Sequence, residues 1–293
     1  MNTTLSQLSS EEKAVLARLK AWLALQLAAE AVRNDEGLRR ACPAAGVSLK
    51  LAIRGAGRVD DGGASTRNGG AGDASMGTSG ASDASKDTTS AGGSGAAMQL
   101  RAKDGRAWIG AAAWPQLVLF FPGPEAAIRV LSGSAGMAIP LPLRPGAFKA
   151  LAFFKKASSS ANELLHSAET PADVRARLLL VATLHGLEAV AGDTYLARRM
   201  EIIPDGVVAV RAGEIEYFVE KRREGIHVAA TPQQADAVLS FADYRSAIDV
   251  LSGKKQAVVA LGSGDVRIEG LLPLVQGLFA VLDRLSWYLG VGL

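Results

Sequence analysis

Apolar residues in the second half of the chain recur first at helical spacing and then at strand spacing. A helix is predicted over about 171–191, where leucines and valines repeat every three to four residues. Three strand-like runs follow, at Val207–Arg211, Glu214–Lys221 and Gly225–Ala230. Short turns around Gly213 and before Gly225 join these runs, which predicts an antiparallel meander.

The pattern then changes again towards the C-terminus. Ala237–Phe241 reads as a fourth strand, and Asp243 is placed to cap a short helix that Gly253 ends. Residues 254–261 fit either a strand or a helix. Val266–Glu269 alternates like a short strand, and an apolar helix is predicted over about 272–289. This order predicts an α+β fold with helices on one face of a sheet.

The first half begins with a long predicted helix. Ser9 and Glu12 have the spacing of a capping box. The helix that follows carries apolar residues near helical spacing, at Leu16, Leu19, Leu23, Leu27 and Val32.

Two stretches of the chain are similar to each other. Residues 118–133 align with residues 238–253 without a gap, 120 positions apart, and both end in Val-Leu-Ser-Gly. Upstream, Glu30–Asp35 aligns with Glu188–Asp193 at an offset of 158. This predicts a duplicated domain, with boundaries at 1–166 and 167–293. The two offsets differ by 38 residues, which indicates an insertion in the first copy between Gly55 and Met98.

The composition of residues 56–97 supports the insertion. Gly, Ala, Ser, Thr, Asp and Asn dominate this segment, and Val59 and Met76 are its large apolar residues. Such a segment cannot bury enough surface to offset the entropy of ordering it, so we predict a disordered excursion from a hairpin tip. Its Asp-Ala-Ser triplets lack the spacing and the closing Glu of a calcium loop.

Charge and cysteine content narrow the classes of function. Residues 1–165 carry 19 Lys and Arg against 13 Asp and Glu, whereas residues 166–293 carry 13 against 16. The basic excess is spread thinly among few aromatic residues, which disfavours nucleic-acid binding. Cys42 is the single cysteine, so a reducing, cytoplasmic location is expected. The polar N-terminus shows no signal peptide.

No catalytic or metal-binding pattern stands out. His166, His185 and His227 lack a serine or cysteine nucleophile in a recognisable motif. His185 and Glu188 form a possible helical pair, for which a partly exposed structural role is the simpler interpretation. No His, Cys and carboxylate cluster has ligand spacing, so neither an enzyme activity nor a cofactor is expected.

The order of motifs in the second half resembles the sterol carrier protein-2 family of lipid-binding domains. The resemblance rests on the strand Ala237–Phe241, on Leu251-Ser-Gly253-Lys254 at a helix end, and on Gly264-Asp-Val-Arg-Ile-Glu-Gly270 before the apolar helix. It covers about 171–290 and, through the repeat, 10–165 more loosely. It implies a helix over 254–261. It also implies two sterol-carrier-like domains, each a mostly antiparallel five-stranded sheet with helices on one face.

The same resemblance implies a function. A final helix would cover an apolar pocket for a lipid, sterol or isoprenoid-like ligand, with transient membrane contact and a possible partner enzyme. Bacterial domains that resemble this family present lipids in isoprenoid-quinone synthesis. The pocket residues would be Phe241, Tyr244, Ile248, Leu251, Leu271, Leu274, Leu278 and Leu282.

Other interpretations stay open. The final helix is long enough to span a membrane, but Asp283 and Arg284 would then lie near mid-bilayer. It could equally be a plain core helix, in a ligand-free scaffold that acts through protein contacts. In the first copy, prolines at 140, 142 and 145 forbid a helix and disfavour a central strand, which leaves a first pocket open to question.

Overall fold

The structure is a computed structural model that describes residues 3–42, 46–56, 97–103, 106–109 and 115–290 of the 293-residue chain. The predicted insertion at 56–97 lies outside the described residues except for its two ends. Its predicted disorder therefore stays a prediction.

The first half, residues 1–166, contains one five-stranded sheet. Its strands are β1 (Val47–Ile53), β2 (Ala97–Lys103), β3 (Arg106–Ile109), β4 (Leu117–Phe121) and β5 (Ile139–Pro142). They lie in the order β3-β2-β1-β4-β5. The burial of β1 alternates, with Leu49, Leu51 and Ile53 buried, as expected of a strand with one face on a core.

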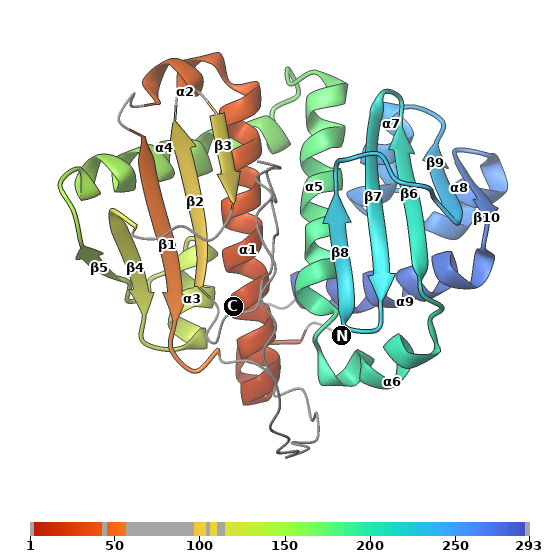
Figure 1. The fold of residues 1–293 in the computed structure, drawn as a ribbon, viewed down its shortest axis with the longest axis horizontal. Coiled ribbons are helices and arrows are strands. Elements are labelled where there is room, and N and C mark those ends of the chain that lie inside the picture. The colour runs from red at the N-terminus through yellow and green to blue at the C-terminus, as the bar shows by residue number, and fades with distance from the viewer. Residues whose placement is uncertain (1–2, 43–45, 57–96, 104–105, 110–114, 291–293) are drawn as a thin grey trace, which may run out of the picture.

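Helices cover that buried face. They are α1 (Ser10–Asn34), α2 (Glu36–Ala41), α3 (Pro124–Leu131) and α4 (Ala147–His166), preceded by the short 3-10 helix η1 (Leu5–Gln7). The predicted capping box is confirmed, because Glu12 N donates to Ser9 Oγ (3.1 Å) and Ser9 N donates to Glu12 Oε2 (3.0 Å). Figure 1 shows α3 and α4 behind the sheet and α1 beside β3.

The second half, residues 167–293, contains the other sheet. Its strands are β6 (Gly206–Ala212), β7 (Ile215–Arg222), β8 (Gly225–Ala229), β9 (Ala237–Phe241) and β10 (Val266–Gly270). Its helices are α5 (Ala172–Val190), α6 (Thr194–Ile202), α7 (Tyr244–Leu251), α8 (Ala257–Ser263) and α9 (Leu272–Leu289). The predicted meander, fourth strand, short helix and final helix are confirmed. Residues 257–263 are helical, as the resemblance implied for this segment.

The second sheet has the order β8-β7-β6-β9-β10, which repeats that of the first sheet strand for strand. The prediction of mostly antiparallel sheets is correct only in part. β1 pairs with β4 in parallel, and β6 pairs with β9 in parallel. The parallel pair arises because the fourth strand of each half, the first after the meander, returns to lie beside the first strand. The sequence pattern does not specify that step.

The two halves meet along α1 and α5. The rings of Trp22 and His185 lie 6.0 Å apart, and Arg177 Nε lies 3.8 Å from Glu30 Oε1, so the two helices run antiparallel. Figure 1 shows them side by side between the sheets. Buried apolar residues of both halves form one continuous core. The halves therefore share packing, and their division into two domains remains a prediction.

The proline-rich segment of the first half forms an edge strand. β5 contains Pro140 and Pro142 and pairs only with β4 among the described strands. Proline cannot donate to a sheet ladder, and it is tolerated at an edge. This agrees with the expectation that the segment would be neither a helix nor a central strand.

Candidate functional site

The residues predicted to line a pocket fall into three groups. Phe241, Ile248, Leu274 and Leu278 are buried in the main core, on β9, α7 and α9. Tyr244, Leu251 and Leu282 are partly buried and pack at the margin of that core. Leu271, just before α9, is exposed. The helices α7 and α9 both pack against α5, so α5 would form a third wall of any site between them.

Tyr244 has a local role that the sequence did not indicate. Its hydroxyl accepts a hydrogen bond from Glu214 N (3.2 Å). Its ring lies over Gly213, where a Cβ atom would stand 2.6 Å from the ring Cζ. Gly213 also has a positive φ of 55°, which favours glycine. Tyr244 thus packs on the β6–β7 turn.

The final helix α9 is closely seated on its neighbours. A Cβ at Gly277 would lie 2.5 Å from the side chain of Ile203. A Cβ at Gly186 of α5 would lie 2.7 Å from the side chain of Leu285. The two glycines let α9 approach the end of α6 and the C-terminal part of α5, which fixes the position of the helix over the sheet.

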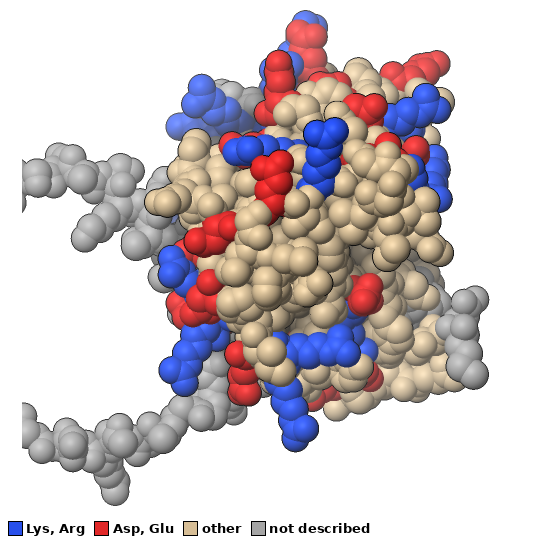
Figure 2. All heavy atoms as spheres, turned by 90° about the vertical axis from the view of Figure 1, so that its right-hand side faces the viewer, with Lys and Arg blue, Asp and Glu red and all other residues tan. Residues whose placement is uncertain are grey.

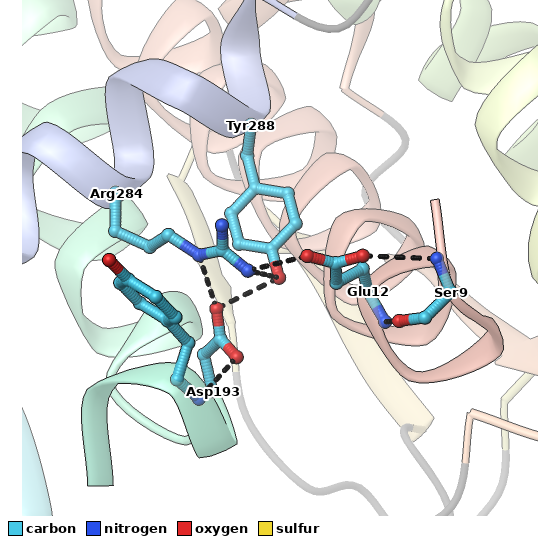
Figure 3. A network of polar contacts seen from close by, with 6 residues as sticks. Ser9, Glu12, Asp193, Arg284 and Tyr288 are labelled. Atoms are coloured by element: carbon cyan, nitrogen blue, oxygen red, sulfur yellow. Dashed lines mark hydrogen bonds and ion pairs between the residues drawn. The ribbon is translucent and has the colours of Figure 1, made fainter. Parts of the chain in front are cut away.

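A polar network holds the C-terminal end of α9 (Figure 3). Arg284 donates from Nε to Asp193 Oδ2 (2.6 Å) and from Nη2 to Glu12 Oε1 (2.9 Å). Tyr288 donates its hydroxyl to the same oxygen of Asp193 (2.9 Å). Asp193 is the N-cap of α6, and its other carboxylate oxygen accepts from Tyr195 N (3.0 Å). The network therefore joins α9 to α6 and to α1 of the first half.

The surroundings of this network shift the pKa values of Glu12 and Tyr288. Burial alone raises the pKa of Glu12, but hydrogen bonds from Ser9 and Arg284 outweigh it and hold that pKa below the ordinary value. Burial and the neighbouring Asp193 carboxylate raise the pKa of Tyr288, which keeps its hydroxyl a donor. The guanidinium of Arg284 also lies 4.0 Å from the ring centre of Trp287, a cation–π distance.

The first half makes a simpler version of the same contact. Asp35 is the N-cap of α2, as Asp193 is of α6. Its carboxylate accepts a hydrogen bond from Ser160 Oγ of α4 (2.6 Å). Each half therefore ties its last helix to the cap of its second helix. In the second half the partner is the charged Arg284, which also reaches Glu12 of the first half.

The opposite end of α9 is apolar and exposed. Leu271 and Leu272 at its start, and Val258 and Val259 on α8, all show large exposed fractions. Figure 2 views the molecule from the side on which α8 and β10 lie and shows a broad area without charged side chains across its middle. Among the residues that the structure describes, no helix combines the length and apolar character needed to cross a membrane.

The histidines form no recognisable reaction centre. His185 Nδ1 lies 3.0 Å from Glu188 Oε2, which places the predicted helical pair together. His227 Nδ1 lies 3.6 Å from the other oxygen of the same carboxylate. His166 is bonded to a backbone carbonyl at the end of α4. Within the described parts of the chain, no group of three or more His, Cys, Asp or Glu side chains could hold a metal ion.

Comparisons with known proteins give structural similarities only. No family model matches the chain, and no curated protein matches its sequence. One similar solved structure is a ubiquinone synthesis protein described as UbiJ-SCP2, with 17% identity and a TM-score of 0.30 over 36% of this chain and 91% of that chain.

Two further similar structures are a sterol carrier protein domain and a sulfatase. Sterol carrier protein domain 2 of Helicoverpa armigera is 19% identical, with a TM-score of 0.31 over 37% of this chain and 88% of that chain. The inverting sec-alkylsulfatase Pisa1 of Pseudomonas sp. is 13% identical, with a TM-score of 0.27 over 53% of this chain and 24% of that chain.

Proposed function

We propose that the chain binds and carries, or presents to a partner enzyme, a hydrophobic ligand of the lipid, sterol or isoprenoid class. The ligand would lie mainly in the second half, between α9, α7 and the sheet. In this proposal the chain is cytoplasmic and performs no reaction, and its two halves arose by tandem duplication. The repeated strand order and the repeated link from an N-cap Asp to the last helix support the duplication.

The contrast between the two ends of α9 carries the proposal. Its C-terminal end is held by Arg284 and Tyr288, while its N-terminal end has exposed Leu271 and Leu272 beside the apolar α8. A helix anchored at one end can open at the other, so we assign ligand entry to the Leu271 end. Replacing water around an acyl chain contributes about 0.8 kcal/mol for each methylene group buried, and no reacting group is needed.

One observation favours a second candidate, the ligand-free scaffold. Phe241, Ile248, Leu274 and Leu278 belong to one continuous buried cluster. If these side chains pack directly on one another, the second half is filled by its own residues. The duplicated chain would then act through protein contacts.

Two measurements separate the candidates. Native mass spectrometry of the purified protein, followed by lipid extraction, should find a bound hydrophobic molecule if the chain is a carrier. Leu278→Trp should then leave the fold intact and abolish binding of a fluorescent fatty-acid probe, because the indole fills the pocket. In a scaffold the same change overpacks a solid core and should cost about 1–3 kcal/mol, without probe binding by either protein. That second result would refute the carrier.

A further inference from the structure

The outer edge of the second half carries exposed aliphatic side chains. On α8, Val258 is 79% exposed and Val259 is 54% exposed, and Leu261 of the same helix is exposed as well. At the start of α9, Leu271 is 38% exposed and Leu272 is 48% exposed. We call these five residues the apolar edge.

The apolar edge lies in a nearly uncharged part of the chain. Residues 256–264, which include α8, contain no Lys, Arg, Asp or Glu, and neither do residues 270–282. Between these two segments, β10 carries one charge of each sign, at Arg267 and Glu269. Figure 2 faces this side of the molecule and shows a broad area without charged side chains across its middle. The surface therefore offers a partner apolar contact without a net charge.

The apolar edge borders the end of α9 that the polar network does not hold. Arg284 lies twelve residues after Leu272 on this helix, which corresponds to about 18 Å along its axis. Leu274, only two residues after Leu272, is fully buried in the main core. The exposed leucines therefore adjoin the part of the core in which we placed the ligand.

The residue types of the apolar edge favour a lipid surface over a protein partner. The residues that dominate protein–protein binding are enriched in Trp, Tyr and Arg, whereas Leu and Val are under-represented among them. Trp, Tyr and Arg are absent from residues 256–264 and 270–282. Aliphatic side chains can instead enter the boundary between headgroups and acyl chains, where their burial contributes to binding in proportion to apolar area.

We propose that the apolar edge docks on the surface of a neutral lipid bilayer, with Val258, Val259 and Leu272 entering its acyl boundary. The choice of a bilayer rests on the proposed function, because a lipid, sterol or isoprenoid ligand resides in membranes and is scarcely soluble in water. Docking in this way brings the Leu271 end of α9, to which we assigned ligand entry, against the source of the ligand.

The first test is co-sedimentation of the full chain with phosphatidylcholine vesicles. We expect binding that needs no anionic lipid and persists in added salt, because salt screens charges but not apolar contacts. Val258→Ser and Leu272→Ser should each weaken binding about tenfold, since each removes an aliphatic side chain that enters the bilayer. Leu289→Ser is the matched control, because Leu289 is 53% exposed at the other end of α9. It should leave binding unchanged.

A fluorescent label measures the insertion directly. Cys42 is the single cysteine of the chain, so Cys42→Ser with Val258→Cys allows one label to be attached on α8. Phosphatidylcholine that carries bromine atoms on its acyl chains should quench this label when the protein binds. The same label on Cys42→Ser with Leu289→Cys should keep its fluorescence. Equal quenching at both positions would contradict docking through the apolar edge.

Absence of vesicle binding, binding that requires anionic lipid, or an equal loss in Leu289→Ser would overturn the proposal. A dimer of the unmodified chain that Val258→Ser dissociates would also overturn it, in favour of contact between two copies. Native mass spectrometry of the same preparation keeps this proposal apart from the proposed function. A bound lipid without vesicle binding overturns the docking alone. Vesicle binding by a protein that holds no ligand supports the docking and counts against the carrier.

Discussion

Removing Arg284 should destabilise the whole chain. Its side chain is 10% exposed, and it lies against Asp193, which is 2% exposed. In Arg284→Ala the carboxylates of Asp193 and Glu12 lose their shared cation while Asp193 stays buried. Most of the free-energy cost of such a change comes from leaving a buried charge without its partner, and less comes from losing the attraction itself.

The size of the effect follows from what remains bound to Asp193. Removing one partner of a buried ion pair costs about 3–5 kcal/mol. Asp193 keeps two donors, the Tyr288 hydroxyl at 2.9 Å and the Tyr195 amide at 3.0 Å. We therefore expect a loss near the lower end, about 3 kcal/mol, which corresponds to a fall in melting temperature of about 6–12 °C in a chain of this size.

Thermal and urea unfolding followed by circular dichroism would measure the loss. Lys13→Ala is the matched control on α1, because Lys13 Nζ pairs with Glu125 Oε1 at 2.6 Å and that glutamate is half exposed. Such a pair contributes at most about 1 kcal/mol. A double variant, Arg284→Met with Asp193→Asn, removes both charges and should recover part of the loss. If Arg284→Ala costs no more than Lys13→Ala, the network does not hold α9.

Three further predictions concern a glycine at a strand end, the Glu12 carboxylate and the predicted insertion. Gly270→Ala should lower the free energy of unfolding by about 3 kcal/mol or more, because the new Cβ would lie 2.3 Å from Asp236 O. Gly133→Ala is the control and should cost about 1 kcal/mol, because Gly133 has a similar φ but no atom within 4 Å of the new Cβ. The pKa of Glu12 is lower in the folded protein than in the unfolded chain. Its ionised carboxylate therefore stabilises the fold at pH values above the unfolded-state pKa, and this contribution is lost as the pH falls through the folded-state pKa. Unfolding measured from about pH 5 to pH 3 should show a shallower loss in Glu12→Gln. Replacing residues 57–96 by a short turn should leave the melting temperature within a few degrees, since loop shortening is worth on the order of 1 kcal/mol.

Local signals explain why the second half could be predicted closely. Asp243 caps α7 by accepting from Ser246 N (2.7 Å), and Gly253 follows the helix with a φ of 76°. Gly270, with a φ of 82°, separates β10 from α9. Each boundary is set by one residue whose chemistry acts within a few positions along the chain. The spans of β9 and α9 could therefore be predicted from sequence alone.

The candidate site contains contacts that no local pattern encodes. Arg284 appeared in the sequence only as a charge that made a membrane span unfavourable. Its partners Asp193 and Glu12 are 91 and 272 positions away. Periodicity within a helix shows which face is apolar, but it does not identify a polar partner on another element. The one available signal was the alignment of Asp193 with Asp35. It indicates a capping aspartate in both halves, but it does not identify the side chain that contacts the carboxylate.

The carboxylate of Glu12 serves two structures at once. One oxygen accepts from Ser9 N and completes the cap of α1, while the other accepts from Arg284 of α9. If the C-terminal end of α9 is released, as in Arg284→Ala, the cap of α1 loses the cation that orients it, and the first turn of α1 should fray more often. Amide hydrogen exchange in that turn then becomes a remote readout of whether this end of α9 is attached. A change made near residue 284 would be visible at the beginning of the chain.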